Sequence, residues 1–227
     1  GRIKESELSI RKAIQLKNDF AIAHSQLGNI LRHFGRLNEA ELSIRKAIEY
    51  DPDCANSHYN LGNILRDLGR LKEAEMSTRC AIKLNPEFPM AYSNLGNISK
   101  DLGNHSEALD SYLKVIKYDP EFYAIYASIS LFLSEVDVSL LDKIQLKNIL
   151  NTLLDRNDLR HQELFKAFSF LYTDLINIEI SKFDSFDTFF SRFEAFTNDI
   201  IVIKALKKIR FGDSIFEKFL TYSRMLI

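Results

Sequence analysis

Apolar and polar side chains are segregated along the first half of the chain with the period of an α-helix. At about 100° per residue, residues 24–31 place an apolar stripe on one helix face and polar side chains on the opposite face. The same segregation returns 34 residues later and once more after that. We expect the stripes to pack on neighbouring helices; they are His24, Leu27, Gly28 and Leu31; His58, Leu61, Gly62 and Leu65; and Tyr92, Leu95, Gly96 and Ser99.

Glycine, proline and small residues repeat at the same interval. The stretch HYNLGNILRDLGRLKEAE, residues 58–75, has close copies 34 residues upstream and 34 downstream. Several independent registers at one period indicate an internal repeat. The registers are Gly28, Gly62 and Gly96; Gly1, Gly35, Gly69 and Gly103; Pro52, Pro86 and Pro120; Ser6, Ala40, Ala74 and Ala108; and Ala13, Ala47, Ala81 and Val115.

Counted from Ala21, Ala55 and Pro89, the unit resembles the tetratricopeptide repeat (TPR), a pair of antiparallel helices A and B. The Leu-Gly pairs match family positions 7 and 8, the second glycine set position 15, the alanines position 20 and the prolines position 32. The resemblance covers residues 1 to about 122 and implies an all-α, right-handed solenoid. It places helix B of a truncated unit at 1–20, complete units at 21–54, 55–88 and 89–122, and degenerate helical repeats or a capping helical domain at 123–227.

The glycines have a physical reason to recur. A glycine inside helix A costs about 1 kcal/mol of helix propensity relative to alanine, so we expect helix B to approach closely there. The glycine at position 15 can end helix A in the left-handed conformation, and the proline stops helix B. One unit cannot bury its own apolar stripe, whereas stacked units can.

The polar stripe of each helix A is the candidate binding face, because in TPR arrays it lines the inner groove. Lys or Glu would keep this face soluble with better helix propensity than the recurrent amides, so the amides need another reason. A carboxamide both donates and accepts hydrogen bonds and can pair with an extended peptide backbone. The predicted groove residues are Gln26, Asn29, Arg32, Asn56, Tyr59, Asn60, Asn63, Arg66, Asn94, Asn97 and Lys100.

We expect Asn60 and Asn94, with Gln26, to form a ladder of amides along the groove, flanked by the asparagines at position 9. This is similar to the asparagine ladder of O-linked N-acetylglucosamine transferase and to long TPR arrays of bacterial proteins, marine cyanobacterial ones included. Two alternatives remain open. The amides could link neighbouring helices structurally, or they could persist from duplication of the repeat.

An acidic ligand is a weaker hypothesis. The carboxylate clamp that TPR domains use for chaperone tails needs basic side chains where this chain has Ser25, Met90 and Asn94, so that mode is disfavoured. A row of cations at position 12 could still attract an acidic ligand. The alternative is that these cations are solvated beside the neighbouring aspartates; the row is Arg32, Arg66 and Lys100, next to Asp67 and Asp101.

The second half is rich in phenylalanine, with 14 of the 17 beyond residue 120. Helix starts are predicted at Ser139, at Asp158, at Asp184 or Ser185, and at Asp213 or Ser214. We expect a phenylalanine stripe to be core that covers the last apolar face of the solenoid, and a short basic run to be a solvated helix face. The stripe is Phe186, Phe189, Phe190, Phe193 and Phe196; the run is Lys204, Lys207, Lys208 and Arg210.

Charge and composition narrow the function classes. With 30 Lys and Arg against 31 Asp and Glu, the chain has no basic excess for nucleic acid. Its longest uncharged run, 122–134, is shorter than the roughly 20 residues needed to span a bilayer. Cys54 and Cys80 lack paired spacing and fit free thiols, so we expect a cytoplasmic protein without a membrane anchor. No enzyme, cofactor or metal-ligand motif is present in the sequence.

Three functional hypotheses follow. In the first, the chain is a non-enzymatic interaction scaffold that binds an extended peptide segment of a protein partner in its groove. In the second, it is the non-catalytic, substrate-recruiting front of a larger bacterial glycosyltransferase or methyltransferase. The third is homo-oligomerisation through an exposed end of the solenoid. Because the repeat begins at position 15 and the last residues are apolar, we expect a piece of a longer protein.

Overall fold

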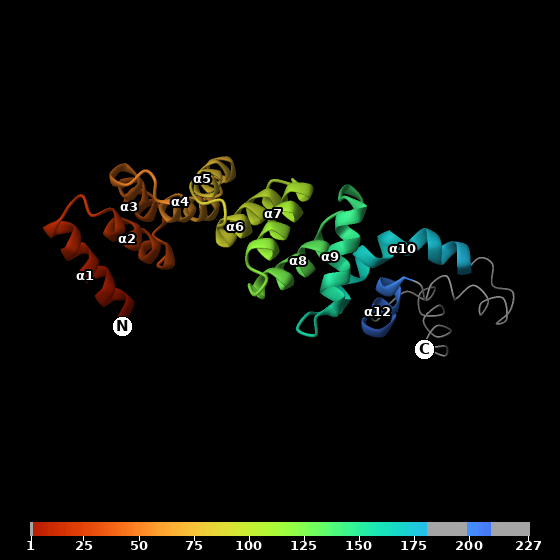
Figure 1. Cartoon of the computed structure of the whole chain (residues 1–227). Coiled ribbons are helices and arrows are strands. Elements are labelled where there is room, and N and C mark those ends of the chain that lie inside the picture. The colour runs from red at the N-terminus through yellow and green to blue at the C-terminus, as the bar shows by residue number, and fades with distance from the viewer. Residues whose placement is uncertain (1, 181–198, 210–227) are drawn as a thin grey trace. The chain divides into compact units, whose positions relative to one another are not determined.

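A computed structural model describes the backbone of residues 2–180 and 199–209 and the side chains of residues 3–172 and 199–209. In these ranges all regular secondary structure is helical (Figure 1). The chain divides into two compact units, residues 1–122 (unit 1) and 123–227 (unit 2). None of the described helices is both long and apolar enough to cross a bilayer.

Unit 1 is a stack of helix pairs. Each pair shares a large contact, α2 with α3, α4 with α5 and α6 with α7, and α1, α3 and α5 each pack on the helix that follows. We refer to α2, α4 and α6 as the A helices and to α1, α3, α5 and α7 as the B helices. The predicted all-α solenoid is confirmed. The bounds are α1 Arg2–Leu16, α2 Ala21–His33, α3 Leu37–Tyr50, α4 Ala55–Asp67, α5 Leu71–Leu84, α6 Pro89–Asp101 and α7 His105–Tyr118.

The glycine at position 15 ends each A helix in the left-handed conformation. Gly35, Gly69 and Gly103 have φ of 72°, 75° and 80°. In the first of these turns the Gly35 amide donates to the carbonyl of Arg32 and the next amide donates to Leu31. Both bonds satisfy carbonyls that the end of a helix leaves without a partner, which is the role expected of this glycine.

The glycine inside each A helix lets helix B approach closely. A methyl group at Gly62 would overlap the side chain of Thr78, and one at Gly96 would overlap the ring of Tyr112. A methyl group at Gly28 would overlap the side chain of Ile44 in the same way. The close helix approach inferred from the repeated glycines is therefore present in all three pairs.

Arginine and glutamate side chains join consecutive B helices. Glu7 accepts hydrogen bonds from Arg11 on its own helix, at 2.8 and 3.0 Å, and from Arg36 of the next repeat at 2.9 Å. Arg45 and Arg70 hold Glu41 in the same way. The hydrogen bond from Arg11, followed by that from Arg36, lowers the pKa of the Glu7 carboxyl below its ordinary value of 4.5. Each carboxylate thus links two repeats.

Unit 2 pairs its helices differently. α8 contacts η2 and α10, and the main contact of α9 is with α12, so the described helices do not form the regular consecutive pairs of unit 1. Phe132 and Phe168 lie in the core of this unit. The bounds are α8 Ala124–Glu135, η1 Val138–Leu140, α9 Lys143–Asp155, η2 His161–Leu164, α10 Phe165–Ile180 and α12 Ile200–Lys208.

Two predicted helix starts in unit 2 are wrong. Helix α9 begins after Asp142, whose carboxylate accepts from the Gln145 amide at 2.8 Å, while Ser139 lies in η1. Asp158 pairs with Arg156 instead of capping a helix, and helical backbone resumes only at His161. At the first place Asp142 caps the helix instead of Ser139, and at the second the Asp158 carboxylate is bonded to Arg156; the local pattern reveals neither outcome. The phenylalanine stripe, Arg210 and the starts proposed at 184–185 and 213–214 lie outside the described residues.

Candidate functional site

The polar faces of the A helices line two adjoining hollows, which we call the A-helix groove. The larger has a volume of about 520 Å³ and the smaller of about 120 Å³. Tyr59 and Asn63 line both, so the hollows adjoin along α4. The larger is also lined by Asn29, Arg32, His33, Asn60 and Asp67, and the smaller by Arg66, Met90, Ser93, Asn94, Asn97 and Phe122.

Most of the predicted groove residues are brought together by this arrangement. Gln26, Asn56 and Lys100 are the predicted members that line neither hollow. Gln26 and Asn56 are exposed on α2 and α4, and Lys100 is half-buried near the end of α6. The helical period explains the grouping, since residues 29, 60 and 63 project from two parallel helices that contact each other directly.

Amides from the first two repeats are available in the groove. The side chains of Asn29 and Asn63 make no hydrogen bond to any other residue that the structure describes. The amide nitrogen of Asn60 lies 3.4 Å from the hydroxyl of Ser25, a long and therefore weak contact. These three carboxamides retain donors and acceptors for a ligand.

Amides from the third repeat are already bonded within the fold. Asn94 is only 4% exposed, and its amide nitrogen donates to the hydroxyl of Thr78 at 3.2 Å. The Tyr112 hydroxyl donates to the side-chain oxygen of Asn97 at 2.9 Å. The expected ladder is therefore interrupted in the third repeat, and Asn94 follows the alternative in which amides link neighbouring helices.

The interruption comes from one position of helix B, opposite the glycine of helix A. Ile44 occupies it in the first unit and offers no hydroxyl, whereas Thr78 and Tyr112 occupy it in the second and third. Polar residues at a position that is otherwise apolar are a signal in the sequence. Their hydrogen-bond partners follow only from the packing of the helices.

Cations at position 12 are paired across neighbouring A helices. The Arg32 guanidinium lies 2.6 Å from the Asp67 carboxylate, and that of Arg66 lies 2.7 Å from Asp101. Each pair is about one-third exposed and lies at the groove wall. Because the aspartate cancels the charge of the arginine in each pair, we interpret these arginines as members of solvated ion pairs and not as a site for an acidic ligand.

Two aromatic residues that are not among the predicted groove residues also shape the groove. The Phe88 ring packs against Tyr59 with 5.2 Å between ring centroids, which fixes the wall shared by the two hollows. Phe122 lines the smaller hollow. Phe20, Phe88 and Phe122 share one position of the repeat, and Cys54 occupies that position in the remaining repeat. The period of 34 residues therefore contains a signal for these aromatic residues.

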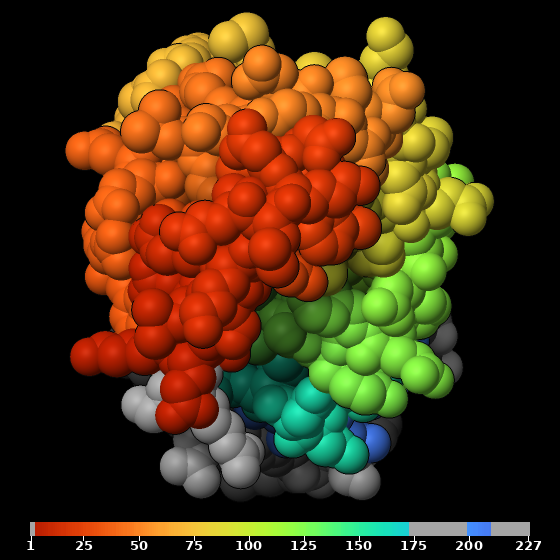
Figure 2. Space-filling model, turned by 90° about the vertical axis from the view of Figure 1, so that its left-hand side faces the viewer, coloured from red at the N-terminus to blue at the C-terminus, as the bar shows by residue number. Residues whose placement is uncertain are grey.

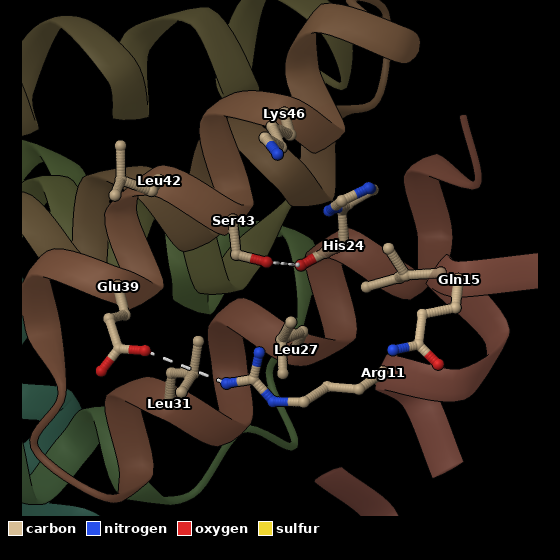
Figure 3. A pocket seen from close by; sticks show the side chains of 10 residues that line it. Arg11, Gln15, His24, Leu27, Leu31, Glu39, Leu42, Ser43 and Lys46 are labelled. Carbon is tan, nitrogen blue, oxygen red and sulfur yellow. Dashed lines mark hydrogen bonds and ion pairs between the residues drawn. The ribbon is translucent and has the colours of Figure 1, made fainter. Parts of the chain in front are cut away.

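Another cavity, of about 350 Å³, opens between α1, α2 and α3 (Figure 3). Its lining includes Leu27, Leu31 and Leu42, and none of the predicted groove residues contributes. Figure 2 shows the N-terminal end of unit 1, with the residues of α1 and α2 in red at the front. Within the described part of the chain, His, Cys, Asp and Glu side chains form no cluster of three or more that could hold a metal ion.

Comparison with known proteins gives the family of the repeats. Models of the Tetratricopeptide repeat match residues 21–54, 55–88 and 89–122. A crystal structure of MamA is similar, with a TM-score of 0.53 and 22% identity over 74% of this chain and 88% of that chain. A second MamA crystal structure has the same TM-score and identity over 77% and 86%. These likenesses show the fold. No curated protein matches the sequence.

Proposed function

Because residues 21–122 are three consecutive tetratricopeptide repeats, we propose that this chain is a protein-interaction module that binds an extended polypeptide segment in the A-helix groove. The observation that carries the proposal is the pair of carboxamides, Asn29 and Asn63, that line the larger hollow without a partner among the described residues. An amide in this state can receive the N–H and C=O groups of a ligand backbone.

The geometry of the groove favours an extended segment over a compact ligand. Its available amides come from successive A helices and follow the stacking direction of the repeats. Tyr59, held by Phe88, stands between the two hollows and can pack against one side chain of the segment. Since the arginines are already paired, the ligand needs no carboxylate.

Magnitudes indicate modest affinity. Three amide contacts at about 0.5–1.5 kcal/mol each contribute roughly 1.5–4.5 kcal/mol. Association costs roughly 4–15 kcal/mol in lost freedom, so the side chain packed on Tyr59 must supply part of the difference. We therefore expect weak binding that depends on backbone groups more than on ligand charge.

A peptide array probed with the full 227-residue chain tests this proposal. We expect retention of extended peptides without a requirement for acidic residues, and loss of binding when the backbone nitrogens of a retained peptide are methylated. The Asn29→Ala, Asn63→Ala double variant should weaken binding of that peptide about tenfold or more in a fluorescence anisotropy titration.

The matched control is Asn38→Ala, which removes an exposed asparagine from α3, outside the groove. It should bind the peptide as the unmodified chain does. Equal affinity of the double variant and the control, or tolerance of backbone methylation, would show that the groove amides do not recognise a polypeptide backbone.

A further inference from the structure

The B helices carry a row of exposed apolar residues at one repeat position. Leu8 is 63% exposed, Leu42 66% and Met76 61%, and we call these three residues the apolar row. They lie on α1, α3 and α5 respectively. The equivalent residue of α7 is Asp110, so the row ends there. Isolated exposed leucines need no explanation, but here three exposed apolar residues recur at one position of consecutive repeats.

A cleft opens beside the row because the B helices are less closely spaced than the A helices. The A helices α2 and α4 contact each other directly, as do α4 and α6, whereas α1 and α3 approach only marginally. The resulting cavity of about 350 Å³ has Leu27 and Leu31 at its base and Leu42 at its edge (Figure 3). Its volume is large enough to receive an apolar side chain from outside.

Charge beside the apolar row is unbalanced. On one side, the Glu39 carboxylate accepts from Arg36 at 2.7 Å, and Arg70 holds Glu73 equally closely, so these acidic charges are compensated. On the other side, Lys12 and Lys46 are exposed and form no ion pair with any residue described in the structure. Glu5, at the same repeat position of α1 as Glu39 and Glu73, is exposed and has no ion pair among the described residues. The two lysines outnumber it, so the net uncompensated charge next to the row is positive and favours an acidic partner.

A helix laid across the B helices can contact more than one member of the row. Because α1 and α3 are not packed directly on each other, successive members are separated by more than the roughly 8–10 Å of packed helices. Two turns of an α-helix advance by about 10.5 Å and three turns by about 16 Å. A partner helix crossing α1, α3 and α5 can therefore contact the row with apolar residues at least two turns apart, and can insert another between Leu8 and Leu42.

We propose that the apolar row and the adjoining cleft form a second docking surface, for an amphipathic partner helix whose apolar stripe is flanked by acidic residues. This surface lies on the B helices and is separate from the A-helix groove. Its occupant is a helix rather than an extended segment. The lining of the cleft consists mainly of apolar and charged side chains and includes no row of amides that could pair with an extended backbone.

Two synthetic helices of about 18 residues serve as probes. Both carry the same leucine stripe, and the flanking residues are glutamate in one and lysine in the other. Titrated with the full chain in fluorescence anisotropy, the glutamate peptide should bind at least about tenfold more tightly than the lysine peptide. Leu42→Glu and Lys46→Glu should each weaken its binding about tenfold or more.

Matched controls separate this surface from the rest of unit 1. Ile22→Glu charges an exposed apolar residue of α2, and Lys114→Glu alters the repeat position of Lys46 on α7, beyond the row. Neither should change the affinity. The Asn29→Ala, Asn63→Ala variant should bind the helix normally, so a failure of the A-helix groove and a failure of the docking surface give different results.

The proposal is wrong if the two peptides bind equally, or if Leu42→Glu and Lys46→Glu bind like the controls while circular dichroism shows them folded. It is also wrong if neither helix binds and decanoate alone displaces an anionic fluorescent dye from the cleft. That result would assign the cavity to a small amphiphile instead of a polypeptide.

Discussion

The amide nitrogen of Asn94 donates a hydrogen bond to the hydroxyl of Thr78, 3.2 Å away, across the contact between α6 and α5. Both side chains are buried. We expect Asn94→Ala to lower the free energy of unfolding by about 1–3 kcal/mol, because it leaves a buried hydroxyl without its partner. Asn63→Ala, at an available amide, should change it by less than about 0.5 kcal/mol.

Urea denaturation followed by circular dichroism measures both variants. A stability loss for Asn63→Ala equal to that for Asn94→Ala would contradict the distinction between the available amides and those bonded within the fold. Thr78→Val, which removes the hydroxyl from the same contact, should in turn leave the Asn94 amide unsatisfied and destabilise the protein to a comparable extent.

Substitution Gly62→Ala should destabilise unit 1 although alanine is the better helix former. The added methyl group would overlap the Thr78 side chain and press on the Ala74 carbonyl at 3.3 Å, so α4 and α5 must move apart. Overpacking of this kind costs about 1–3 kcal/mol, which is at least as large as the gain in helix propensity of about 1 kcal/mol. Thermal unfolding measures the balance, and a raised melting temperature would show that the helices yield without cost.

Replacement of Asn104 should strengthen the third junction between B helices. Arg36 and Arg70 occupy this repeat position in the first two units and hold Glu7 and Glu41, whereas Asn104 stands there in the third. Its side chain makes no capping hydrogen bond to α7, so nothing of that kind is lost. We expect Asn104→Arg to pair with Glu75 and to add about 0.2–1 kcal/mol, an amount typical of partly exposed pairs.

The control for that gain is Asn104→Gln, which lengthens the side chain without adding charge and should have little effect. Differential scanning calorimetry at low and high salt distinguishes the two. The gain of the arginine variant should shrink at high salt, and a gain independent of salt would point to a cause other than the ion pair.

Acid should weaken the solenoid through two other carboxylates that are bonded to Arg36 and Arg70. The pKa values of Glu39 and Glu73 lie below the ordinary 4.5, in each case first because of the hydrogen bond from the arginine three residues earlier, Arg36 or Arg70. A carboxyl whose pKa is lower in the folded state stabilises the fold above 4.5, and this contribution disappears as the pH falls below that value through the folded pKa.

The urea concentration at the unfolding midpoint should therefore decrease as the pH is lowered from about 7 to about 3. This decrease should be smaller in the Arg36→Gln, Arg70→Gln double variant. That variant removes the donors that lower the two pKa values. An unchanged pH dependence would mean that these carboxyls do not contribute to acid unfolding.

Local sequence was sufficient to predict the repeat, because its determinants act within one helix pair. A left-handed turn at Gly69 needs glycine whatever lies around it, and the glycine inside α4 signals a close helix approach wherever the repeat occurs. The structural role of these glycines follows from their own lack of a side chain and not from the residues around them. The second half lacks these markers. Two of its predicted helix starts were wrong, because Asp142 and not Ser139 caps α9 and because Asp158 pairs with Arg156.

By itself, the sequence determined that residues 21–122 form three stacked helix pairs with amides on one face, since period and residue type suffice for both. Only the tertiary structure decided which amides remain available. Asn63 and Asn97 occupy the same repeat position, yet Asn97 is bonded to Tyr112 while Asn63 faces the open hollow. The physical reason is that a hydrogen bond depends on the partner that packing brings within about 3 Å, and that partner belongs to another helix.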